Sequence, residues 1–221
     1  MDSLRTTSPD RKAGYLALYA AICLCPAFLA GCNVIYKTSV RPPDYYYINP
    51  DKQLGTIGKV ALVELGNHSS YPEISTDMTE ALFQALQKRQ LFSVVVVSQS
   101  ESKWRSLQLE PTPPFTLDQL SAMQKALQAN AVLVGYVTTY RPYPHMSIAL
   151  RLWLVDLADG QLLWAFEQVW DTADKTTEKR VKQYFQSQTS SGFTQMREEL
   201  VVVSPLRFVK FVAHEVADTM R

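Results

Sequence analysis

The side chain best placed to do chemistry is the thiol of Cys32, which directly follows two small residues, Ala30 and Gly31. The segment before it, residues 14–30, is uncharged and largely apolar. Three basic residues precede that segment: Arg5, Arg11 and Lys12. A basic start, an apolar run of about 17 residues and small residues at its end are typical of a secretory signal, and the run is short for a lasting membrane span.

The tetrapeptide Leu29–Cys32, which reads Leu-Ala-Gly-Cys, resembles a bacterial lipobox. The resemblance implies that residues 1–31 are removed, that the Cys32 sulfur carries a diacylglycerol, and that the freed amine is acylated, for example with palmitate. Each acyl chain contributes about 0.8 kcal/mol per buried methylene, so two or three chains hold a protein on a bilayer. Asn33 is not the aspartate that retains lipoproteins at the inner membrane, which favours the outer membrane. The alternative is a plain N-terminal anchor helix with an incidental cysteine.

The other cysteines and the histidines form no pattern that indicates catalysis or metal binding. Cys23 and Cys25 lie inside the segment expected to be removed, and no cysteine follows Cys32. The histidines, which are scattered and lack a second ligand at metal-binding spacing, are His68, His145 and His214. Phosphate-binding glycine loops, dinucleotide fingerprints and nucleophile elbows are also missing from the sequence.

Three carboxylates merit separate consideration. Asp156 and Asp159 flank a tight turn, where aspartate is favoured for turn geometry. Glu64 ends the first expected strand, and open α/β sheets place ligands at the carboxyl ends of their strands. A solvated strand-end carboxylate is the simpler interpretation of Glu64. The sequence therefore predicts a protein that is not an enzyme and that needs no metal and no cofactor.

Charge and length characterise the chain after the signal. The full chain has 22 basic and 21 acidic residues, and removal of residues 1–31 leaves 19 of each. A net charge near zero gives no electrostatic reason to bind nucleic acid or an anionic membrane surface. The remaining length of about 190 residues suits one domain with a tether.

We expect three parts: a signal peptide at 1–31, a lipidated tether at 32–58, and an α/β periplasmic domain at 59–221. The tether is rich in proline, glycine and tyrosine, which argues against a long helix or a central strand. Its consecutive tyrosines, Tyr45 to Tyr47, are open to two interpretations. They dock onto a partner, or they pack the tether onto its own domain.

Hydrophobic periodicity divides the domain into alternating strands and helices. The expected strands are 60–65, 92–97, 131–140, 147–157 and 161–170, with Asp159-Gly160 as the turn of a hairpin. A helix capped by Ser75 or Thr76 follows the first strand, and a second begins after Thr116 and buries Leu117. Further helices are expected at 173–186, with Thr172 as a possible N-cap, and from Ser204-Pro205 to the end. This order predicts an α/β fold: one mixed sheet, parallel at the start and antiparallel at the end, flanked by helices.

Several of these segments resemble a known group of proteins. The strand Lys-Val-Ala-Leu-Val-Glu-Leu, the Leu91-Phe92 step and the strand that opens at Ala129 are similar to envelope lipoproteins with the anticodon-binding-domain-like α/β fold. That group includes the curli-secretion lipoprotein, the lipoprotein activator of penicillin-binding proteins and the N-terminal domain of TolB-type proteins. The resemblance covers roughly residues 59–171 and implies a fold more than a function.

The curli lipoprotein contributes hairpins to a transmembrane pore, which needs segments of about ten alternating residues. The corresponding segment here, 172–203, carries its charges at helical spacing, and its apolar end, Leu200–Val203, is too short to cross. A pore subunit is therefore the less favoured alternative.

We predict a membrane-anchored, non-catalytic protein-binding or assembly module whose domain faces the periplasm. Its partners are the bilayer, through acylated Cys32, and an unidentified envelope protein, with no nucleic acid. The alternative is a subunit of an oligomeric outer-membrane secretion channel. Exposed aromatic residues tend to mark interfaces, and the candidates that periodicity leaves unburied are Trp104, Tyr140, Tyr143 and Trp153.

Overall fold

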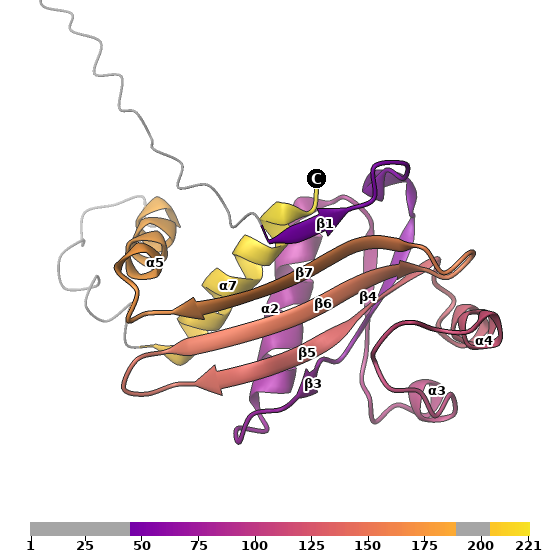
Figure 1. The fold of residues 1–221 in the computed structure, drawn as a ribbon, viewed down its shortest axis with the longest axis horizontal. Coiled ribbons are helices and arrows are strands. Elements are labelled where there is room, and N and C mark those ends of the chain that lie inside the picture. The colour runs from indigo at the N-terminus through magenta and orange to yellow at the C-terminus, as the bar shows by residue number, and fades with distance from the viewer. Residues whose placement is uncertain (1–44, 189–203) are drawn as a thin grey trace, which may run out of the picture. The chain divides into compact units, whose positions relative to one another are not determined.

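The structure, a computed structural model, describes residues 45–188 and 204–221 (Figure 1). The expected signal peptide, Cys32 and the first part of the tether lie outside these residues, as does the apolar run Leu200–Val203. The signal cleavage, the lipid and the domain bounds therefore remain predictions.

One mixed sheet of seven strands organises the domain, in the order β1-β7-β6-β5-β2-β4, with β3 paired to β5. The strands are β1 (Tyr46–Ile48), β2 (Lys59–Val63), β3 (Gly66–Asn67), β4 (Ser93–Val97), β5 (Ala131–Arg141), β6 (Ser147–Asp156) and β7 (Leu162–Asp171). Strands β4, β2 and β5 are parallel to one another, and β5, β6, β7 and β1 are antiparallel. The predicted fold class is confirmed: an α/β fold with one mixed sheet, parallel at the start and antiparallel at the end.

Helices flank both faces of this sheet. They are α2 (Ile74–Arg89), α3 (Ser102–Arg105), α4 (Leu117–Leu127), α5 (Lys175–Gln188) and α7 (Pro205–Thr219), with a 3-10 turn, η2, at Leu54–Thr56. In Figure 1, α2 and α7 lie behind the strands, while α3 and α4 lie beside the parallel strands.

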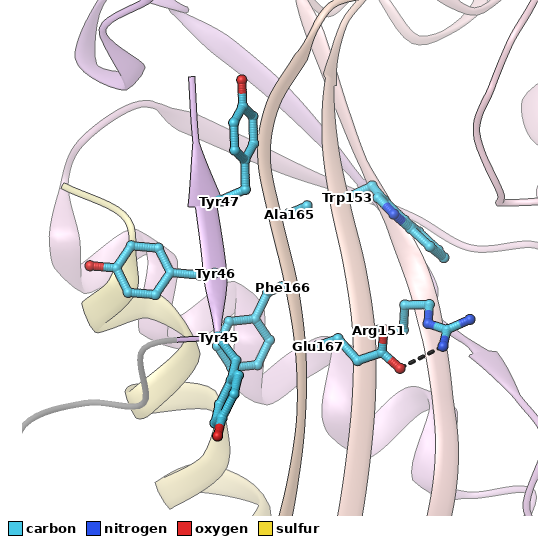
Figure 2. A pocket seen from close by; sticks show the side chains of 8 residues that line it. All are labelled: Tyr45, Tyr46, Tyr47, Arg151, Trp153, Ala165, Phe166 and Glu167. Carbon is cyan, nitrogen blue, oxygen red and sulfur yellow. Dashed lines mark hydrogen bonds and ion pairs between the residues drawn. The ribbon is translucent and has the colours of Figure 1, made fainter. Parts of the chain in front are cut away.

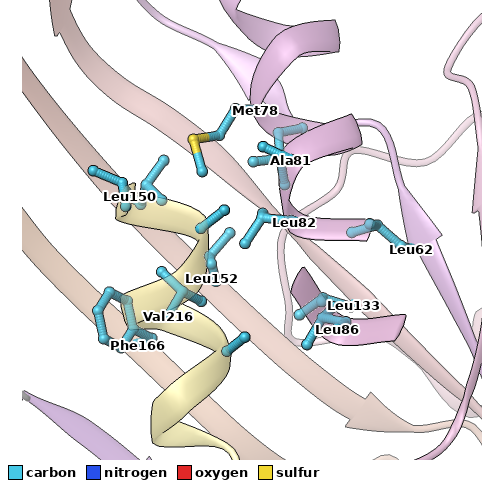
Figure 3. Packing of buried hydrophobic residues seen from close by; sticks show 14 of the residues in the cluster. Leu62, Met78, Ala81, Leu82, Leu86, Leu133, Leu150, Leu152, Phe166 and Val216 are labelled. Carbon is cyan, nitrogen blue, oxygen red and sulfur yellow. The ribbon is translucent and has the colours of Figure 1, made fainter. Parts of the chain in front are cut away.

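The larger hydrophobic cluster fills the space between the sheet and helices α2 and α7 (Figure 3). Alternate residues of the strands point into it, as period-two patterning requires. The sheet contributes Leu62, Leu133, Leu150, Leu152 and Phe166, all of them 2% exposed or less. Helix α7 contributes one side of its surface, including Phe208, Phe211, Val212 and Val216. This first cluster runs under the whole sheet, from β4 to β1.

A second cluster lies on the opposite face, where α3 and α4 pack. It joins Ala61 and Val63 of β2 to Met123 of α4, and these three side chains are fully buried. Val132 and Val134 of β5 also belong to it. The members of this second cluster come chiefly from β2, β4 and β5, so these helices cover the parallel half of the sheet.

The helix starts show which capping predictions were right. Thr116 accepts from the N–H of Gln119, whose side chain accepts from the Thr116 N–H, so the predicted start of α4 is confirmed as a capping box. Ser75 and Thr76 do not cap α2, which starts at Ile74, because the Ser75 hydroxyl instead donates to the carbonyl of Leu65. Asp174, rather than Thr172, accepts the first amide bonds of α5, from Thr176 and Thr177.

Leu117 was expected to be buried by its helix and is 74% exposed. It occupies the first helical position of α4, where its side chain projects beyond the second cluster. Leu120, Met123 and Leu127 form the buried stripe at the expected three- and four-residue spacing. Leu206 in the first turn of α7 is likewise half exposed, at 50%.

The end of the expected tether joins the sheet. Tyr46, Tyr47 and Ile48 pair with Phe166, Ala165 and Trp164 of β7, which makes β1 an edge strand. Tyr46 and Ile48 pack against the first cluster, whereas Tyr47 points to the other face of the sheet. Leu54, in η2, is buried at 1% exposure. This short edge strand ends before Pro50, which agrees with the exclusion of a central strand there.

Candidate functional site

The antiparallel half of the sheet has one face that no described helix covers. We call it the open face. It consists of alternate residues of three neighbouring strands: Tyr45 and Tyr47 at β1, Arg151 and Trp153 of β6, and Ala165, Glu167 and Val169 of β7. Most of these residues also line a shallow groove that runs between β1 and β6 (Figure 2).

Strand register sets the order of side chains across this face. Tyr47 pairs with Ala165, and Ala165 pairs with Trp153 on the next strand. Because Ala165 is small, it leaves a depression between the two aromatic side chains on either side, as Figure 2 shows. Trp153 in turn pairs with Val134 and packs against the margin of the second cluster, so it is only half-buried.

The open face is apolar to an unusual degree for a surface that meets solvent. Tyr45, Tyr47 and Val169 are 73%, 46% and 62% exposed. An exposed valine gains strand propensity but no burial, and exposed apolar side chains that gather on one surface tend to mark interaction sites. The face therefore has the composition expected of a contact surface, with aromatic residues on the two strands that flank β7.

Two charges lie within the same face and neutralise each other. Arg151 donates to the carboxylate of Glu167 across the β6–β7 pair. That bond is the main reason why the pKa of Arg151 is raised above its ordinary value. Both side chains are largely exposed, so the pair contributes little to stability. It leaves the face without a net charge that would favour a strongly charged partner.

The structure separates the four residues predicted as partner contacts. Trp153 lies on the open face. Trp104 does not: it is 4% exposed, because the short helix α3 turns it into the second cluster. The sequence indicated only a polar stretch there, so the prediction that Trp104 is available for contact was wrong.

Tyr140 and Tyr143 lie at the far end of β5. Tyr143 is 68% exposed and lines a small cleft with Pro144, His145 and Glu178. Tyr140 is half-buried on the helix side of the sheet, with its ring edge-to-face with Tyr71 at 5.3 Å between centroids. Burial raises the pKa of the Tyr140 hydroxyl above its ordinary value. These two tyrosines form no continuous surface with Trp153.

Glu64, the carboxylate at the end of β2, is engaged in hydrogen bonds with other residues of the domain. It accepts from the Ser98 hydroxyl at 2.6 Å, the Gln99 N–H at 3.1 Å and the Thr76 hydroxyl at 3.1 Å. The Ser98 bond is the largest cause of a pKa lowered from the ordinary value. Glu64 therefore fastens the ends of β2 and β4 together, which is a structural role.

The turn aspartates are also structural. Asp156 and Asp159 both accept from the Lys52 ammonium, at 2.6 and 2.5 Å, and each caps a backbone N–H of the turn. His68 stacks on Tyr136 at 4.6 Å, and His214 stacks on Tyr184 at 4.7 Å. Over residues 45–188 and 204–221, no group of three or more histidine, cysteine or acidic side chains could hold a metal ion.

One buried polar cluster lies on the helix side of the sheet. The Glu215 carboxylate accepts from the Trp170 ring N–H at 2.6 Å and pairs with Arg180 at 3.1 Å. Burial nevertheless raises the pKa of Glu215 above its ordinary value. This cluster ties α5 and α7 to β7, and sequence periodicity gave no indication of it.

Sequence reasoning missed most of the open face. It placed Arg151 and Trp153 on the face of β6 that does not carry the leucines. It left open whether Tyr45 to Tyr47 bind a partner or pack onto the domain. It did not identify Val169 or the pairing of β1 with β7. The alternation of Ala165, Glu167 and Val169 between large buried residues was the available signal.

Comparison with known proteins finds similarity among solved structures. No protein-family model and no curated protein matches the chain. Solved structures similar to it include a PelC dodecamer from Paraburkholderia phytofirmans, at 15% identity and a TM-score of 0.42, covering 75% of this chain and 94% of that one. Lipoprotein GNA1162 from Neisseria meningitidis is 16% identical with a TM-score of 0.42, covering 61% and 99%.

The C-terminal domain of LpoB from Salmonella enterica is also similar, at 23% identity and a TM-score of 0.37, covering 52% of this chain and 83% of that one. LpoB is the penicillin-binding-protein activator lipoprotein in the group that the sequence resembles. These similarities lie below 25% identity and a TM-score of 0.5, so none of them assigns an activity. Within the described part of the chain, no helix is both long and apolar enough to cross a membrane.

Proposed function

We propose that this chain is a membrane-anchored envelope lipoprotein that acts as a non-catalytic protein-binding module. In this proposal, Cys32 carries the lipid, the domain faces the periplasm from the outer membrane, and the open face receives an envelope protein. The observation that carries the proposal is the exposed apolar face of the antiparallel half, with Tyr47, Trp153 and Val169 on adjacent strands.

The chemistry of this surface supports a protein partner. A flat, aromatic face with one neutralised ion pair offers shape and apolar area rather than a charge for an ionic ligand. The carboxylates that could have served catalysis are instead engaged by the fold, as Glu64 and Asp159 show. The groove is shallow and lies along strands, which suits a protein surface better than an enclosed small molecule.

Site-specific photo-crosslinking in intact envelopes tests the contact surface. A photoreactive residue at Tyr47 or Val169 should capture one discrete protein. The same residue at Leu117, which is 74% exposed on α4 and is not one of the open-face residues, is the matched control. Capture at Leu117 but at neither open-face position would contradict the proposed surface.

The anchor is tested separately. The Cys32→Ser chain should remain unprocessed, so the intact mass of the membrane-extracted protein should still include residues 1–31. The wild-type chain should lose these residues and gain the mass of its acyl chains. A correctly matured Cys32→Ser chain would remove the lipid from the proposal and leave the contact surface untouched.

A further inference from the structure

Strand β4 lies at one edge of the sheet, and no strand within residues 45–188 and 204–221 pairs with its outer side. The N–H of Ser93 donates to the carbonyl of Gly58 at 2.8 Å, and the N–H of Glu64 donates to the carbonyl of Val97 at 2.8 Å. Both ends of β4 are therefore bonded to the β2 side. Because successive residues of a strand direct their backbone groups to opposite sides, Val95 also bonds to β2. The N–H and C=O groups of Val94 and Val96 point away from the sheet.

This edge lacks the features that normally protect one. Residues 90–98 contain no charged residue and no proline, and the β2–β4 register is continuous, without a bulge. Edge strands are usually kept apart by lysines, prolines, bulges or short length. The opposite edge has such protection, because β1 is three residues long and is followed by Pro50. Val96 is 37% exposed, so the free edge is reachable.

We propose that β4 pairs antiparallel with β4 of a second copy of this chain, about a twofold axis beside Val95. In this register Val94 faces the partner's Val96, and the two residues exchange both backbone hydrogen bonds. The twofold axis generates a second, identical pair between Val96 and the partner's Val94. The two pairs form four hydrogen bonds in total, from backbone groups that have no strand partner among the described residues. Val95 then faces the partner's Val95 in the closer, non-bonded type of pair.

The properties of the edge favour a second copy as the occupant. A strand added beside Val94, Val95 and Val96 should be uncharged and β-branched, to pack across the pair without an uncompensated charge. Strand β4 meets that requirement itself. The charges that flank the strand are already satisfied within the chain, Arg89 by Asp218 and Glu101 by the Ser98 N–H, so neither opposes a second copy. A twofold interface also closes on itself as a dimer rather than a ring.

Disulfide trapping of the full chain in detergent tests the register. In the non-bonded type of pair, facing Cα atoms lie about 4.5 Å apart, which is within the range of a disulfide. Val95→Cys should therefore give a reducible dimer under mild oxidation. Ser93→Cys is the matched control on the same strand and face, because Ser93 faces the partner's Val97 and the two introduced thiols lie too far apart. The wild-type chain sets the background from the native cysteines.

Sedimentation of the same detergent-extracted chain tests the hydrogen bonds. Val96→Pro removes an outward N–H and no bond to β2, and an edge strand tolerates proline there. It removes two of the four bonds, so the dimer dissociation constant should rise by at least about tenfold over Val96→Thr, which keeps the N–H.

Two results would overturn the pairing: Val95→Cys that crosslinks no better than Ser93→Cys, or a wild-type chain that sediments as a monomer at every concentration. If Val96→Pro does not fold, the disulfide comparison still decides.

Discussion

The two halves of the sheet are built from similar residues but are covered differently. The parallel half, β4-β2-β5, has helices on both faces, so Val63 on one side of β2 and Leu62 on the other are both fully buried. The antiparallel half, β6-β7-β1, has helices on one face only among the described residues. Its other face leaves Tyr47 and Val169 in solvent.

This difference follows from topology. Parallel strands need crossover connections, and here the crossovers place α2 on one face and α3 and α4 on the other. Antiparallel hairpins need no crossover, so β6 and β7 acquire cover only from the C-terminal helices. A hairpin face of this type is normally polar. Under the proposed function, the apolar side chains on the open face serve contact with a partner rather than folding.

The largest expected loss of stability comes from a substitution on the face of the sheet that α3 and α4 cover. Met123→Ala removes a fully buried side chain that joins α4 to the sheet. We expect a loss of about 2–5 kcal/mol in the free energy of unfolding, from lost burial and a cavity. Chemical denaturation of the two purified chains measures it. A loss within about 0.5 kcal/mol, the usual size for surface substitutions, would mean that α4 does not hold this face.

A matched pair of substitutions compares the halves directly. Val63 and Val169 lie on the same side of the sheet, one covered and one exposed. Val63→Thr buries a hydroxyl and should cost about 1–3 kcal/mol, because the group loses its water. Val169→Thr should change the free energy of unfolding by no more than about 0.5 kcal/mol. Equal losses at both positions would contradict the assignment of an uncovered face.

The covered side of the antiparallel half should show a specific pH dependence. Burial raises the pKa of Glu215 above its ordinary value of 4.5, so the folded state binds this proton more tightly than the unfolded state. The stabilisation from this group is present at low pH and is lost as pH rises through the folded pKa. Relative to Glu215→Gln, the wild-type chain should therefore lose stability as pH rises from about 4 upward through the folded pKa.

Thermal unfolding of both chains across that pH range measures the effect. The neighbours that face Glu215, namely Arg180, Trp170 and Asp218, are the same in both chains. If the difference in stability between the wild-type chain and Glu215→Gln does not change with pH, the Glu215 carboxyl titrates alike in the folded and unfolded states, which would contradict this prediction.

The sequence predicted five of the seven strands, without β1 and β3, and it did not predict the open face. Period-two runs such as 147–157 and the Asp159-Gly160 turn predicted β6, β7 and the mixed sheet correctly, because burial on one face imposes that pattern locally. Trp104 could not be placed, since its burial depends on a four-residue helix inside a polar stretch. Val169 could not be assigned either, because alternation alone does not say which face of a hairpin the helices cover.

The most direct test of the open face is a charge placed on it. Val169→Lys and Tyr47→Lys should leave the melting temperature close to that of the wild-type chain, because both side chains are already exposed. We expect an envelope protein to co-purify with the wild-type chain, and both variants should abolish its recovery, whereas Leu117→Lys on α4 should not. Undiminished recovery with both open-face variants would contradict the claim that this face binds a partner.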